Sequence, residues 1–114
     1  MSKQKAKGTL AEVQLLKYLQ DNNLLAVRNP PSGVKDKGDL TILGKPSVTI
    51  EVKNCKTMQL SEWVKEAVTE KENAGTDIGL VIHKKARTQD PSKWYCTLPV
   101  SELLNLLGSV YLNS

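Results

Sequence analysis

The sequence has 114 residues, a formal net charge of +4, 39% hydrophobic residues and 25% charged residues, which is the balance of one small globular domain. It contains no stretch of eighteen apolar residues, and its basic N-terminus lacks the apolar segment of a signal peptide, so we expect a soluble, cytoplasmic chain. Two cysteines and one histidine are too few for a disulfide framework or a structural zinc site. The chemistry of this chain must therefore use carboxylates, lysines or a hard metal ion.

The pattern of apolar and turn-forming residues predicts the element order α-β-β-β-α-β-β-α. We interpret residues 1–114 as a single domain in which residues 1–7 form a flexible basic arm. The expected elements are a helix at 8–20, a strand at 24–28, a hairpin of strands at 39–43 and 48–53, a helix at 59–73, strands at 78–83 and 94–98, and a helix at 100–107. This order predicts an α/β protein with a central mixed sheet.

Two acids and a lysine on the predicted hairpin form the most informative motif, Asp39 followed by Glu51-Val52-Lys53. Glu51 and Lys53 are two residues apart on a strand, so their side chains project from the same face. The hairpin brings Asp39 beside Glu51, where two carboxylates and the Val52 carbonyl offer oxygen ligands for Mg²⁺ or Mn²⁺. Lys53 would orient a water or stabilise phosphate charge, as metal-assisted phosphodiester hydrolysis requires. The same Glu-x-Lys pattern is also common as an exposed ion pair.

A third acid, Glu12, lies on the first predicted helix at the border of its apolar face. A carboxylate there is costly unless it is paired or close to a metal ion. The residues leave two interpretations open. Glu12 belongs to the candidate site, or it completes a capping box with Thr9 at the start of the helix.

Charge is unevenly distributed along the chain. Residues 1–11 and 83–93 each carry a net charge of +3, whereas residues 61–77 carry −3. The second predicted helix has an apolar stripe around Trp63, and its other side carries Glu62, Glu66, Glu70 and Glu72. A basic side suits an anionic partner such as nucleic acid, although an ordinary solvated surface explains the same counts.

Taken together, these motifs resemble the PD-(D/E)xK nuclease superfamily and, within it, the archaeal-type Holliday junction resolvases. The resemblance covers residues 3–105 and rests on the order and spacing of several short motifs. The matching segments are Gly8-Thr9-Leu10-Ala11-Glu12, Ala26-Val27-Arg28, Gly38-Asp39-Leu40, Ile50-Glu51-Val52-Lys53, the strand and basic turn from Ile78 to Lys84, and Trp94-Tyr95. The chain departs from the family pattern at Gly38, where the motif often has proline, and in a longer, proline-rich loop around Ser32.

The resemblance implies a restriction-endonuclease-like fold, with an α-β-β-β-α-β core and a central mixed sheet flanked by helices. It also implies a metal-dependent endonuclease that acts as a symmetric homodimer. The site residues that it implies are Asp39 and Glu51 as metal ligands, Lys53 as the catalytic lysine, Glu12 as an acid near the metal, and Ser32 as a loop serine that assists cleavage. Gln59 matches a glutamine that helps the metal site in some members, although a polar residue in a first helical turn is the simpler explanation.

We therefore expect Mg²⁺ or Mn²⁺ as cofactor, a four-way DNA junction as partner, and no membrane association. The basic residues expected to contact phosphates are Lys3, Lys5, Lys7, Arg28, Lys35, Lys37, Lys84, Lys85 and Arg87. Two alternatives are a general endonuclease of the same superfamily that acts on duplex, flap or repair intermediates, and a DNA-binding module without the chemistry. The leucines at the C-terminus exceed what one helix face needs, which leaves two interpretations open, a dimer surface or intramolecular core.

Overall fold

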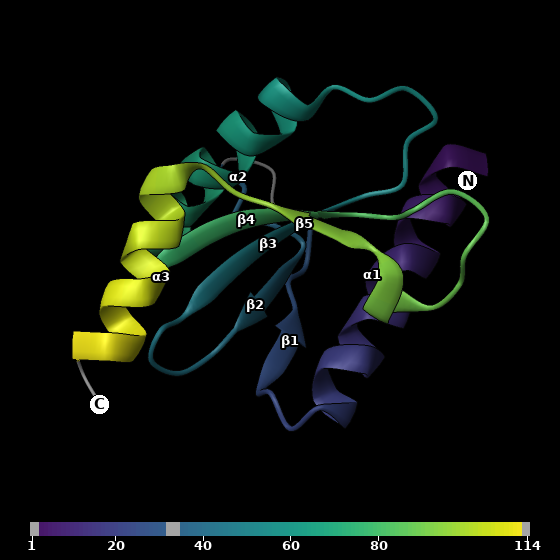
Figure 1. The fold of residues 1–114 in the computed structure, drawn as a ribbon. Coiled ribbons are helices and arrows are strands. Elements are labelled where there is room, and N and C mark those ends of the chain that lie inside the picture. Colours follow the sequence, from purple (N-terminus) through teal and green to yellow (C-terminus); the bar gives the residue numbers. More distant parts are fainter. Residues whose placement is uncertain (1–2, 32–34, 113–114) are drawn as a thin grey trace.

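A computed structural model describes residues 3–31 and 35–112, with side chains from Lys7 onward. Its elements in chain order are α1 (Lys3–Asp21), β1 (Ala26–Arg28), β2 (Leu40–Ile42), β3 (Val48–Lys53), α2 (Leu60–Ala74), β4 (Ile78–His83), the 3₁₀ turn η1 (Pro91–Lys93), β5 (Tyr95–Thr97) and α3 (Val100–Leu112). The strands form one sheet in the order β1-β2-β3-β4-β5, in which β3 and β4 are parallel and the other neighbours antiparallel (Figure 1). The predicted α/β class with a mixed sheet flanked by helices is confirmed.

The side chains of β3 alternate between the two faces of the sheet, so this strand contributes to a packing layer on each face. Val48, Ile50 and Val52 join the larger core, which α1 covers with residues such as Leu15. On the other face, α2 packs over a smaller apolar cluster of Trp63, Ala67 and Val81. Since Glu51 pairs with Val81 across the parallel ladder, the predicted site acid of β3 lies in the layer beneath α2.

The helix α2 lies very close to β4, and a glycine makes this possible. A Cβ atom at Gly79 would lie 2.8 Å from the carbonyl oxygen of Ala67, so a larger residue would push the helix away. The backbone N–H of Gly79 donates to Glu102 on α3, and Lys71 on α2 donates to the same carboxylate at 2.8 Å. This buried carboxylate joins α2, α3 and β4, and it is fully partnered.

Two predictions for the N-terminal segment are wrong. The basic arm expected at residues 1–7 is already helical from Lys3 in the part that the structure describes. Lysine, glutamine and alanine are strong helix formers, and an internal glycine such as Gly8 costs only about 1 kcal/mol. Thr9 thus lies inside α1 and cannot cap it, so the capping-box interpretation of Glu12 is wrong as well.

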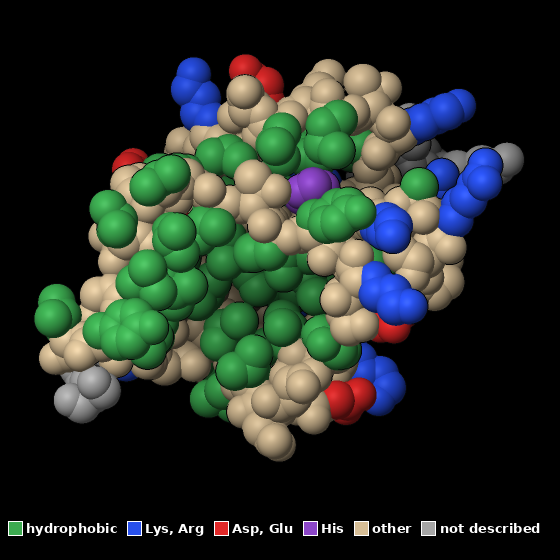
Figure 2. Space-filling view, viewed as in Figure 1, with side chains coloured by type: hydrophobic (Ala, Val, Ile, Leu, Met, Phe, Trp, Pro, Cys, Tyr) green, Lys and Arg blue, Asp and Glu red, His purple; other side chains and the backbone are tan. Residues whose placement is uncertain are grey.

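One face of the molecule exposes many hydrophobic side chains. Figure 2 shows them over the sheet between α3 and α1, and along α3 itself. The exposed large hydrophobic residues of α3 include Val100, Leu103, Leu104, Leu107, Val110 and Leu112. A contiguous apolar surface of this kind marks an interaction site rather than ordinary surface. Within residues 3–31 and 35–112, no helix is long and apolar enough to cross a bilayer.

Candidate active site

Asp39 lies just before β2, beside the middle of β3. Its backbone N–H donates to the carbonyl of Ile50 at 3.0 Å, and its Oδ2 accepts from the N–H of Val52 at 2.9 Å. The hairpin therefore places the Asp39 carboxylate against the Glu51-Val52 peptide, as the sequence spacing predicts. The N–H and C=O of one strand residue point toward the same edge, so the Val52 carbonyl also opens toward Asp39.

Glu51 is nearly buried, with 5% of its surface exposed. Burial raises the pKa of this carboxyl far above its usual range, and the neighbouring carboxyls of Asp39, Glu66 and Glu70 raise it further. Four acids in contact cannot all be charged without a compensating cation. The position of Glu51 therefore favours either an added proton or a bound cation.

Lys53 projects from the same face of β3 as Glu51, as the alternation predicts. Its Nζ lies 2.8 Å from Glu66 on α2 and 3.9 Å from Glu51. Burial lowers the pKa of Lys53, but the ion pairs with Glu66 and Glu51 outweigh burial and raise it. The ammonium group is thus held charged at the edge of the acid-rich centre, and its closest ion pair is with Glu66 rather than with Glu51.

Glu12 faces the same region from α1. Its Oε1 accepts from Arg28 Nε at 3.0 Å. Burial raises the pKa of Glu12, the charge of Asp39 raises it further, and Arg28 acts in the opposite direction. Both residues line a cavity of about 510 Å³ together with Asp39. Of the two interpretations of Glu12, the structure supports the one that places it beside the candidate site.

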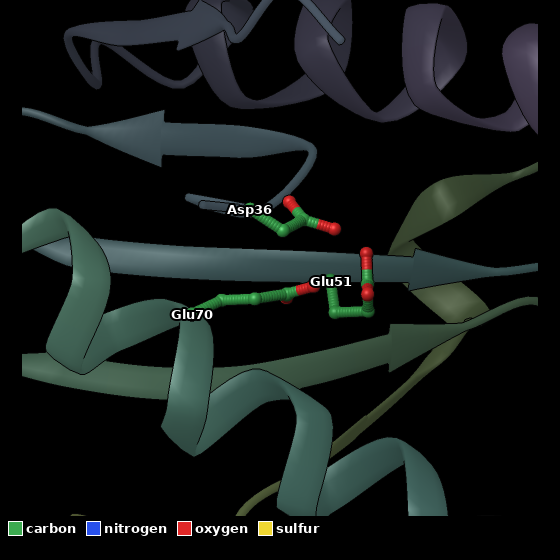
Figure 3. A group of neighbouring side chains, drawn as sticks. All are labelled: Asp36, Glu51 and Glu70. Carbon is green, nitrogen blue, oxygen red and sulfur yellow. The ribbon is translucent and has the colours of Figure 1, made fainter. Parts of the chain in front are cut away.

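The sequence interpretation missed two acids, Asp36 and Glu70. Oxygen atoms of Asp36, Glu51 and Glu70 all lie within 4.8 Å of one another. Figure 3 shows the three side chains converging from a loop, from β3 and from α2. Glu70 was expected on the outer side of its helix, but only 2% of its surface is exposed. The spacing of Trp63, Ala67 and Glu70 could have placed it on the buried stripe.

Gly38 explains how Asp36 reaches this position. Its φ of +88° is in the left-handed region, which proline cannot adopt and other residues rarely do. A Cβ atom here would lie 2.6 Å from Cγ2 of Thr49. The turn lets the Gly38 N–H donate to Asp36 Oδ1 at 2.8 Å. Glycine in place of the motif proline therefore has a structural cause.

Two further predicted residues have no established place in the site. Ser32 lies outside the described residues. Gln59 precedes α2 and makes no side-chain capping hydrogen bond. It lines a cavity of about 680 Å³ together with Lys53 and Lys56.

The predicted basic residues are distributed over several parts of the molecule. Lys7 lines both the 680 Å³ cavity beside Lys53 and a second cavity of about 580 Å³. Lys56, which the sequence interpretation missed, also lines both cavities. The second cavity is also lined by Lys84, Lys85 and Arg87. Figure 2 shows Lys and Arg side chains gathered on this side of the molecule. A basic surface therefore leads up to the candidate site.

The other predicted basic residues lie elsewhere. Lys35 and Lys37 flank Asp36 and are exposed, and Arg28 is ion-paired with Glu12. The side chains of Lys3 and Lys5 lie outside the described part of the chain.

The residues present fit a hard divalent cation. Asp39, Glu51 and the Val52 carbonyl provide oxygen donors, which Mg²⁺ and Mn²⁺ prefer. Lys53 compensates this oxygen-rich centre only in part, because its Nζ lies 3.9 Å from Glu51 and its shortest ion pair is with Glu66. Such an ion would supply Lewis-acid stabilisation to a bound phosphate.

Comparisons with known proteins give a structural match. No family model matches the chain, and no curated protein matches its sequence. A solved structure of Hjc from Archaeoglobus fulgidus, a Holliday junction resolvase from an archaeal hyperthermophile, matches with a TM-score of 0.61 and 27% sequence identity. The match covers 82% of this chain and 78% of that chain. The chain therefore has the fold of an archaeal Holliday junction resolvase, and its resemblance to these members of the PD-(D/E)xK nuclease superfamily is confirmed.

Proposed function

We propose that this protein is a metal-dependent endonuclease that resolves four-way DNA junctions by paired, symmetric nicks. The observation that carries the proposal is the convergence of Asp39, Glu51 and Lys53 in a resolvase-like fold. A binding module without chemistry has no need to gather buried acids around a lysine, because such a cluster destabilises the fold unless a cation is present.

Each site residue has a role that follows from its surroundings. Asp39, Glu51 and the Val52 carbonyl would hold Mg²⁺ or Mn²⁺, which would stabilise charge on the scissile phosphate. Lys53 is kept charged by Glu66 and offers N–H donors to the same phosphate or to the attacking water. Glu12 positions Arg28 through a 3.0 Å ion pair, so the guanidinium can contact a neighbouring phosphate.

The exposed apolar face of α3 and the adjoining sheet supports a homodimer. An isologous interface repeats the same patch on both subunits and places two identical sites about a two-fold axis. Two symmetry-related nicks made in one junction during a single binding event require two such sites. The proposal therefore assigns the hydrophobic face in Figure 2 to subunit contact and the basic side to DNA.

The test of the proposed activity compares a labelled four-way junction with a linear duplex made from one of its strands, each with Mg²⁺ or EDTA. We expect paired nicks in the junction with Mg²⁺ and none with EDTA. Equal cutting of the duplex would leave the metal site in place and change the function to a general endonuclease. Cleavage of neither substrate would contradict the enzymatic proposal and favour a binding module.

A second prediction concerns the basic side. Replacing Lys84 and Lys85 by alanine is expected to weaken junction binding and to reduce the slope of log affinity against log salt by about 2, because each phosphate contact releases about one counterion. Fluorescence anisotropy at several salt concentrations measures both quantities. Lys17→Ala is the matched control, because Lys17 is exposed and pairs with Asp21 on α1. An unchanged slope in the double variant would remove these two lysines from the DNA surface.

A further inference from the structure

Glu70 and Glu102 are both buried glutamates, but their surroundings differ. Glu102 is 3% exposed, and its carboxylate accepts from Lys71 at 2.8 Å, from the N–H of Gly79 at 2.6 Å and from Asn105 at 3.0 Å. Glu70 is 2% exposed, and neither of its oxygens has a hydrogen-bond partner among the described residues. Buried polar groups without partners are rare in native proteins, and each of them points to a missing water, proton or ion.

The unpartnered carboxylate of Glu70 is directed at two other carboxylates. Figure 3 shows it extending from α2 toward Glu51 on β3, with Asp36 on the opposite side. The position of Asp36 is fixed from two directions. The N–H of Gly38 donates to Asp36 Oδ1 at 2.8 Å, and Asn73 on α2 donates to the Asp36 carbonyl oxygen at 2.9 Å. The fold therefore holds three acids together instead of separating them.

In the part of the chain that the structure describes, no ion pair reaches Asp36 or Glu70, and Glu51 has only a long one of 3.9 Å with Lys53. The nearby Lys53 is ion-paired with Glu66 at 2.8 Å. A groove of about 360 Å³ opens onto Asp36 and Glu70, and the other charged residues of its lining are Glu62, Glu66 and Lys65. A small cation from solution can therefore reach Asp36 and Glu70 through a groove in which four acids outnumber one lysine.

We propose that Asp36, Glu51 and Glu70 bind a second hard divalent cation, which shares Glu51 with the ion assigned to Asp39. Three carboxylates offer the oxygen ligands that Mg²⁺, Mn²⁺ and Ca²⁺ prefer. Two ions joined by one carboxylate can stabilise the attacking and the leaving oxygen of an in-line displacement. That role in cleavage rests on the proposed function, whereas binding of the ion does not.

The test counts bound Mn²⁺ without DNA, by calorimetry and by electron paramagnetic resonance, up to millimolar concentrations. The starting protein is Asp39→Asn, because this change removes a ligand of the first site only. We expect it to bind one Mn²⁺ per chain, with a rise in melting temperature on adding the ion. Adding Glu70→Gln, or separately Asp36→Asn, is expected to abolish that binding and the temperature rise. Adding Glu72→Gln, which changes an exposed acid of the same helix, is the control and should leave both unchanged.

The outcomes separate this inference from the proposed function. If Asp39→Asn binds no Mn²⁺ while the wild type cleaves junctions, the second site does not exist and the proposed function stands. If Asp39→Asn retains one ion that Glu70→Gln removes, but the wild type cleaves no DNA, the second site stands and the proposed function fails. Binding that survives both Glu70→Gln and Asp36→Asn would place the ion elsewhere and overturn the inference.

Discussion

Replacing Asp39 by asparagine, or Glu51 by glutamine, is expected to abolish cleavage of a four-way junction while sparing junction binding. Each change keeps the size of the side chain but removes a charged oxygen ligand of the assigned ion. Metal-ion stabilisation of phosphate charge supplies several kcal/mol, so its loss corresponds to a fall of about 10³-fold or more in cleavage rate. Single-turnover cleavage with Mg²⁺ measures this effect.

Junction binding should survive for an electrostatic reason. DNA affinity comes from cations that meet phosphates, and a carboxylate near the phosphate opposes it. Removing one acid should therefore leave the affinity for the junction, measured in EDTA, equal to that of the wild type or slightly higher. The control is Glu72→Gln, an exposed acid on α2, which should cleave at the wild-type rate. Wild-type cleavage by both Asp39→Asn and Glu51→Gln would show that the site is misassigned.

The half of the site on the β2-β3 hairpin could be predicted because its geometry is local. The five residues 43–47 that join β2 to β3 determine the register, and the register determines which side chains face each other. Asp39 and Glu51 therefore meet as the spacing indicates, and Lys53 shares the face of Glu51. The prediction that the Glu12 carboxylate is paired or lies near a metal ion rested on a different principle, the cost of an acid at the edge of an apolar face. In the structure, Arg28 is its ion-pair partner.

The other half of the site depends on tertiary contacts that local patterns do not reveal. An acid on a helix is normally assigned to solvent, so Glu70 was placed outside although it follows Trp63 and Ala67 at helical spacing. Asp36 lies in a loop whose path depends on the left-handed Gly38. The early start of α1 was missed because Gly8 was taken as a helix boundary, although the residues before it favour helix.

Replacing Leu104 and Leu107 on α3 by glutamate is expected to convert a dimer into a monomer. Both residues are surface leucines, 63% and 38% exposed, so the folded subunit tolerates charge there. In an isologous interface each substitution occurs twice, and the buried, unpaired carboxylates would outweigh the apolar contact. Sedimentation equilibrium measures the mass, which should fall from that of two chains to that of one. Met58→Glu is the control, because Met58 is 60% exposed in the segment between β3 and α2.

Loss of the dimer should change the ratio of linear to open-circular product more than it changes the rate of a single nick. A plasmid that extrudes a cruciform reports this difference, because two nicks made during one binding event give linear DNA, whereas a single nick gives an open circle. The monomeric variant retains Asp39, Glu51 and Lys53, so it should still nick, but its products should shift from linear to open-circular DNA. A variant that remains dimeric would remove α3 from the interface. A monomer that still gives linear plasmid at the wild-type ratio would show that paired cleavage does not depend on two joined sites.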